Sequence, residues 1–192
     1  MIADIKKLAY QWVTAEEKNV NVANDYYCQT RDVFETKNNK MFDVLIKQGV
    51  NENIVYLIYA IIGELGNNSF DHNLGDWPNI MGIFFGYYYN INKKSGLVII
   101  ADRGLGVLTT LKKAMPSLKN DQEALQIAFT KKISSRILEN RGNGLKFVKQ
   151  NIKDAKLHLE FQSGKARAVI NCKMNINSLD NLIQGCLAIL TF

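Results

Sequence analysis

Three short segments, taken together and in their order along the chain, constrain its structure more than any other feature. They read Glu64-x3-Asn68-x3-His72, then Asp102-x-Gly104-x-Gly106, then Arg141-Gly142-x-Gly144-Leu145. Each segment alone is weak evidence, because paired glycines mark turns in many proteins and polar residues four apart often decorate an exposed helix. Their order, and the elements expected around them, make the combination specific.

The first segment falls within a helical pattern over residues 53–70. Apolar residues recur there at steps of three and four, as an amphipathic helix requires: Ile54, Leu57, Ile58, Ile61, Ile62 and Leu65. On such a helix Glu64, Asn68 and His72 form one row. Mg²⁺ prefers oxygen ligands and takes few from protein, so Asn68 is a candidate ligand. Glu64 could then activate a water or hydroxyl. An exposed, capped helix end is the alternative interpretation.

The second segment follows residues 96–101, an apolar, β-branched run that is typical of a buried strand. Asp102 is therefore expected at the end of a strand. Gly104 and Gly106 lack a Cβ and would let a ligand approach the backbone closely. A carboxylate in this place can accept a hydrogen bond from an exocyclic amine such as that of adenine. A tight turn without any ligand explains the same residues.

The third segment opens a predicted helix over residues 145–152. Unpaired N–H groups and the positive end of the helix dipole favour phosphate at such a start. The segment lacks the Lys-Ser/Thr ending of a P-loop, and no clear strand precedes it, which disfavours a dinucleotide fingerprint. Between the glycine segments, residues 107–141 form a long connection with a helix of its own near 122–129. Long insertions are usually functional covers, so we expect a nucleotide lid.

Together the segments resemble the three nucleotide-binding boxes of the GHKL superfamily, which includes DNA gyrase B, histidine kinases and mismatch-repair ATPases. The similarity spans about residues 53–174. The first box is spelled most like that of the stand-alone anti-sigma-factor serine kinases. The resemblance implies an α/β fold, a two-layer α/β sandwich with a mixed, mostly antiparallel sheet and helices on one face.

The resemblance also implies roles for particular residues. Glu64 would be the catalytic base, Asn68 the Mg²⁺ ligand and Asp102 the acceptor for the adenine amine. The implied cofactors are ATP and Mg²⁺, and the other implied ATP contacts are His72, Gly104, Gly106, Arg141, Gly142, Gly144 and Leu145. Two departures limit the transfer. Ser69 stands where alanine is usual, and residues 165–172 lack the threonine that many members place near adenine.

Length and composition fit one compact unit. The chain has 192 residues, 47% of them hydrophobic, which is enough for a proper core. We expect residues 1–50 to pack as an N-terminal segment on an ATP-binding domain of residues 51–192. No apolar run approaches the roughly 20 residues of a membrane span, and no signal peptide is predicted. Three widely spaced cysteines favour reduced thiols and a cytoplasmic location.

Local patterns predict the remaining elements. Helices are expected over residues 5–18 and 40–48, and strands over 26–34 and 83–91. Residues 155–162 and 165–174 alternate as a hairpin that turns at Ser163-Gly164. The apolar tail over residues 179–192 packs either on the domain or on a partner.

Features that the sequence lacks narrow the range of possible functions. A histidine autokinase needs a phosphoacceptor histidine, but the two histidines lie in the first segment and in a predicted strand. The net charge of +6 is spread along the chain, which disfavours a nucleic-acid partner. The first hypothesis is a Mg-ATP-dependent ATPase or serine/threonine protein kinase that regulates a protein partner. The alternative is a non-catalytic module that senses ATP or ADP and whose lid gates partner binding. The sequence leaves a homodimer open.

Overall fold

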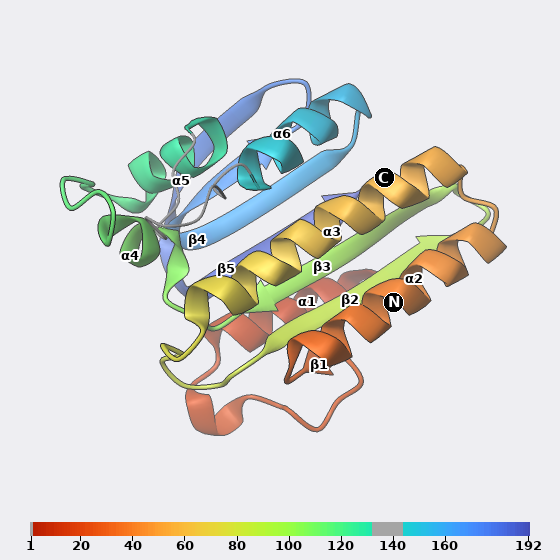
Figure 1. Ribbon diagram of the computed structural model, residues 1–192. Helices are drawn as coiled ribbons and strands as arrows, with labels where there is room; N and C mark the ends of the chain where they lie inside the picture. The colour runs from red at the N-terminus through yellow and green to blue at the C-terminus, as the bar shows by residue number, and fades with distance from the viewer. Residues whose placement is uncertain (1, 132–143) are drawn as a thin grey trace.

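Antiparallel pairing organises the whole molecule. The computed structural model describes residues 2–131 and 144–192, and within them the strands form one five-stranded sheet in the order β1-β2-β3-β5-β4 (Figure 1). All four neighbouring pairs in this described sheet are antiparallel. The strands are β1 (Tyr27–Cys28), β2 (Ile83–Asn90), β3 (Ser95–Asp102), β4 (His158–Ile170) and β5 (Met174–Thr191).

Helices α2, α3, α5 and α6 cover one face of the sheet, and α1 lies on the other (Figure 1). The helices are α1 (Ile2–Thr14), α2 (Arg31–Lys47), α3 (Glu52–Asn73), α4 (Gly106–Lys112), α5 (Asp121–Thr130) and α6 (Gly144–Asp154), with a 3-10 turn η1 (Glu17–Asn19). No helix in the described ranges combines the length and apolarity needed to cross a membrane.

Alternation along the strands divides the interior into two cores. In β3, Val98 and Ile100 belong to the larger core beneath α2, α3, α5 and α6. Leu97, Ile99 and Ala101 belong to the smaller core beneath α1. Successive side chains of a strand point to opposite faces, so β3 is buried on both sides. The predicted two-layer α/β sandwich is confirmed, and α1 covers part of the second face in addition.

The N-terminal segment differs from its prediction: the helix expected over residues 5–18 ends at Thr14, and the helix expected over 40–48 already begins at Arg31. Residues 26–34 were expected to form a strand, but the strand ends at Cys28. The Thr30 hydroxyl accepts a hydrogen bond from the Val33 N–H (3.4 Å) and caps α2, which begins at Arg31. Helix capping at threonine therefore prevails over the β propensity of the neighbouring residues.

The C-terminal region also differs. The predicted hairpin turn at Ser163-Gly164 is wrong, because β4 continues through these residues with only an irregular register to β5. The chain instead reverses between Ile170 and Met174. The apolar tail packs on the domain itself: the second half of β5 lies between β3 and β4, where Leu190 is fully buried.

Helix α3 is the longest of the described helices, and it carries the polar row expected from the sequence. The Asn51 side chain caps it by accepting a hydrogen bond from the Ile54 N–H (3.3 Å). Its packing on α2 depends on Gly66, where an added Cβ would lie 2.2 Å from the ring of Phe34. Gly63, one turn earlier, has no such neighbour, and its nearest contact would be 3.8 Å away.

We therefore expect Gly66→Ala to destabilise the protein by about 1–3 kcal/mol, since the buried Phe34 ring must move. Gly63→Ala on the same helix should be neutral or stabilise by up to about 1 kcal/mol, because alanine is the better helix former. Urea unfolding followed by circular dichroism measures both. Equal effects of the two substitutions would contradict the described packing of α2 on α3.

Candidate functional site

The row predicted on α3 is present. Glu64, Asn68 and His72 lie on one side of the helix and are partly exposed, while Leu65 and Ser69 face the sheet and are buried. Glu64 and Asn68 form no side-chain hydrogen bond or ion pair with any residue in the described ranges. Within that part of the chain, no hydrogen bond or ion pair therefore occupies their oxygens.

Asp102 ends β3 and is almost completely buried, with 2% of its surface exposed. Its carboxylate accepts a hydrogen bond from the Ser69 hydroxyl (2.8 Å) and another from the Gly104 N–H (2.9 Å). Burial raises the pKa of Asp102 from 3.8 to about 6, and the hydrogen bonds from Gly104 and Ser69 oppose part of that rise. Ser69, which the sequence marks only as a departure from the usual alanine, thus contacts the central carboxylate directly.

Asn73 fixes the loop that follows Asp102. Its Oδ1 accepts a hydrogen bond from the Leu105 N–H (2.8 Å), and its Nδ2 donates to the Ser69 carbonyl (2.7 Å). A Cβ at Gly104 would overlap this amide, at 2.1 Å, so only glycine allows the approach. Gly106 has a φ of +75° and begins α4, a helix that was not predicted and that precedes the predicted helix near residues 122–129.

Residues of β4 and β5 that were not predicted from the sequence complete the surroundings of Asp102. Cys186 pairs with Asp102 on one side and with Ser163 on the other, so the three lie in one row across the sheet. Ser163 Oγ accepts from the Val107 N–H (2.9 Å) and donates to the Gly185 carbonyl (3.1 Å).

The close packing around Asp102 also requires a glycine at position 185. It has a φ of +74°, and a Cβ there would lie 2.2 Å from the Asp102 carbonyl oxygen. The strand near adenine was expected in residues 165–172, but residues 186–191 of β5 pair with β3. The glycine that directly precedes the apolar run of residues 186–190 is the sequence signal that could have pointed to this strand.

The third segment meets the first at the start of α6. A Cβ on Gly144 would lie 1.7 Å from Glu64 Oε1, so the helix start lies directly against this carboxylate. Leu145 is partly buried against the larger core. Arg141 and Gly142 lie outside the described residues, as do Lys132 and Arg136. Helix α3 is thus the common neighbour of Asp102, Gly104 and Gly144.

The donors on α3 fit Mg²⁺ by their chemistry. Asn68 offers an amide oxygen and Glu64 a carboxylate one turn away, and Mg²⁺ usually takes one or two protein oxygens together with phosphate oxygens and water. No group of three or more His, Cys, Asp or Glu residues in the described ranges could hold a metal by itself. A metal at Asn68 would therefore be bound together with a ligand that supplies further oxygens.

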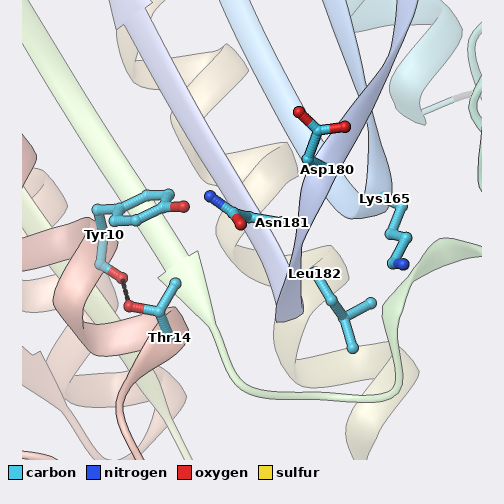
Figure 2. A pocket seen from close by; sticks show the side chains of 6 residues that line it. All are labelled: Tyr10, Thr14, Lys165, Asp180, Asn181 and Leu182. Carbon is cyan, nitrogen blue, oxygen red and sulfur yellow. Dashed lines mark hydrogen bonds between the residues drawn. The ribbon is translucent and has the colours of Figure 1, made fainter.

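A separate hollow of about 560 Å³ lies beside α1 and contains none of the predicted site residues. Its walls come from α1, β4 and β5, and they are Tyr10, Thr14, Lys165, Asp180, Asn181 and Leu182 (Figure 2). The Asp180 carboxylate and the Lys165 ammonium point away from one another in this view. The arrangement brings no reactive groups together, and the predicted site on α3 remains the better candidate.

Comparison with known proteins identifies no relative: no family model matches the chain, and no curated protein is significantly similar to it. Its function is therefore inferred from the residues themselves and from their geometry.

The buried carboxylate makes a pH-dependent stability testable. The pKa of Asp102 lies near 6 in the folded protein, whereas its ordinary value is 3.8. The contribution of Asp102 to the free energy of unfolding is therefore most favourable below about pH 4 and is lost as the pH rises through 6. By neutral pH, the expected loss in the free energy of unfolding is roughly 3 kcal/mol.

Asp102→Asn should remove this component and flatten the dependence of unfolding free energy on pH between about 4 and 7. Urea unfolding across that range provides the measurement. Asp43→Asn, at an exposed position on α2, is the control and should keep the slope. An unchanged slope in the Asp102 variant would contradict the burial of a titrating carboxylate.

Proposed function

We propose that this chain binds Mg-ATP and transfers or hydrolyses its γ-phosphate in the regulation of a protein partner. The convergence on α3 carries the proposal: Ser69 contacts Asp102, Asn73 contacts the Gly104-Leu105 loop, and Glu64 contacts Gly144. These are the three segments that resemble the GHKL nucleotide boxes. The three unpaired cysteines suit the reducing cytoplasm, which is where we place the protein.

Asp102 supplies the base-recognition end of the proposed site. A buried carboxylate that already accepts hydrogen bonds from Ser69 and Gly104 still has lone pairs for an exocyclic amine. Because the carboxylate is desolvated, a donor placed against it gains more than it would in water. Cys186, on the neighbouring strand, pairs with Asp102 across the sheet and borders the same carboxylate.

Glu64 and Asn68 supply the phosphate end. Ser69, which contacts the Asp102 carboxylate, and Glu64 are five residues apart. Roughly 7–8 Å of helix therefore separates the contact with Asp102 from Glu64, the proposed catalytic base. Bound Mg²⁺ would neutralise phosphate charge beside Asn68. Glu64 would accept the proton of the attacking water or hydroxyl, and the start of α6 would orient N–H groups toward the phosphates.

A second function is favoured by the contact between Gly144 and Glu64. Because the start of α6 lies against the carboxylate, any ligand that moves this helix also changes what Glu64 faces. A non-catalytic module could use that movement to report the bound nucleotide to a partner. Both functions require nucleotide binding, but only the first includes turnover of ATP.

Binding is tested first, by calorimetry with Mg-ATP and Mg-ADP. We expect micromolar affinity in the native chain and a loss of about tenfold or more in Asp102→Asn, because a charge-assisted acceptor for the base is removed. The control is Asp76→Asn, an exposed carboxylate that pairs with Lys113 (2.8 Å), and it should bind normally. Normal binding by the Asp102 variant would remove this residue from the site.

Turnover is tested next, by phosphate release with and without candidate protein acceptors. Glu64→Gln should lower the rate about a hundredfold or more while affinity stays within about tenfold. Gly144→Ala should also lower the rate, since the new methyl must displace the Glu64 carboxylate. Glu52→Gln, in the first turn of the same helix, is the control. Tight binding without turnover in the native chain would favour the sensing module.

A further inference from the structure

Helix α6 carries three lysines along its surface, and a fourth lysine follows just beyond the helix end. Lys146, Lys149 and Lys153 follow one another at steps of three and four, which places them on one side of the helix, and Lys156 comes three residues later, beyond the helix end at Asp154. Lys146, Lys153 and Lys156 are exposed, and Lys149 is partly exposed. The three lysines on the helix span about 10 Å along its axis. We call these four residues the lysine row.

Intramolecular ion pairs do not explain the lysine row. Some other basic side chains are paired, including Arg31 with Asp71, Lys113 with Asp76 and Arg167 with Glu160. None of the four lysines forms an ion pair or a side-chain hydrogen bond with a residue in the described ranges. Their charges therefore face solvent without compensation from that part of the molecule.

Helix stability does not explain the row either. Cations are favourable near the C-terminus of a helix, where Lys153 lies, but unfavourable near the N-terminus, where Lys146 lies. Helices α2, α3 and α5 each begin with acidic residues, whereas α6 has none in its first turn. The first turns of α6 are thus more positive than helix formation favours.

Lys156 occupies a position where glycine would be easier. The helix ends in a Schellman motif, with the Leu157 N–H bonded to the Ile152 carbonyl (3.0 Å) and the Lys156 N–H to the Lys153 carbonyl (3.3 Å). Lys156 is the left-handed residue of this motif, with a φ of +55°. A non-glycine residue in this conformation is strained, so glycine at this position would be more favourable for stability.

We propose that the lysine row is the docking surface for an acidic segment of a partner protein, most simply a helix. A helix that carries carboxylates at steps of three and four can place one opposite each lysine in turn. Phe147, on the neighbouring side of α6, is 42% exposed and offers an apolar contact beside the charges. Asp154 also lies on the exposed side, but it accepts hydrogen bonds from Gln150 (2.9 Å).

The spacing of charges is the basis of the test. The probe is a labelled, helix-forming peptide of about 20 residues with glutamates at steps of three and four. It is compared with a peptide of the same composition whose glutamates are clustered, and with a single-stranded DNA of equal charge. Fluorescence anisotropy measures binding, and amide chemical shifts show where on the chain the peptide lies. We expect the spaced peptide to bind most tightly, with shifts concentrated on α6.

The triple variant Lys149→Glu, Lys153→Glu and Lys156→Glu should weaken binding by at least about tenfold. Its matched control reverses the same number of exposed lysines elsewhere, Lys40, Lys47 and Lys173, and should weaken binding by less than about threefold. Both variants should bind Mg-ATP as the native chain does, so the result is independent of the proposed nucleotide site. Equal losses in the two variants would overturn the proposal, as would no binding of the peptide at low salt.

A single substitution separates docking from folding. Lys156→Gly should raise the stability of the protein, because glycine relieves the left-handed strain, and yet weaken peptide binding by about twofold to fivefold. Higher stability with unchanged binding would overturn the role of Lys156. Tighter binding of the DNA than of the spaced peptide, with the same dependence on the lysine row, would overturn the assignment to a protein partner.

Discussion

The hydrogen bond from the Ser69 hydroxyl to the Asp102 carboxylate joins the helical layer to the end of β3. A buried carboxylate is costly unless its oxygens are occupied, so the positions of α3 and of the loop at Gly104 depend on one another. Asn73 strengthens the same connection by holding the Leu105 N–H. The arrangement fixes the helix against the strand within the candidate site.

The other candidate groups are arranged around this contact along one helix. Asn68 and Glu64 precede Ser69 on the partly exposed side of α3, and the start of α6 lies against Glu64. On the sheet, Cys186 and Ser163 extend the row that begins at Asp102. A rigid helix and three neighbouring strands therefore hold the candidate groups, which is the kind of support that precise positioning requires.

Two residues that depart from the most stable local choice belong to surfaces with a functional proposal. Asp102 is a carboxylate whose pKa is raised to about 6 by burial, and Lys156 takes a left-handed conformation that glycine would adopt without strain. Natural sequences keep such residues mainly where function requires them. The carboxylate belongs to the proposed nucleotide site, and the lysine belongs to the row on α6, so α6 connects the two surfaces.

Much of the helical layer could be predicted because its signals are local. Local sequence patterns placed α3, α5 and α6 close to their observed bounds, and the apolar run before Asp102 identified β3. The C-terminal strand could not be placed in this way. An apolar segment has the same pattern whether it forms an edge or a centre, so only pairing with β3 and β4 made β5 an interior strand.

The sequence by itself determined which groups are available: the spaced polar residues of α3, the acid at a strand end and the glycines of the loops. Tertiary structure decided what they contact. The donation from Ser69 to Asp102, the close approach of Gly144 to Glu64, and the row from Asp102 through Cys186 to Ser163 all join residues far apart in the chain. Such contacts depend on strand order and helix packing, which a local pattern does not encode.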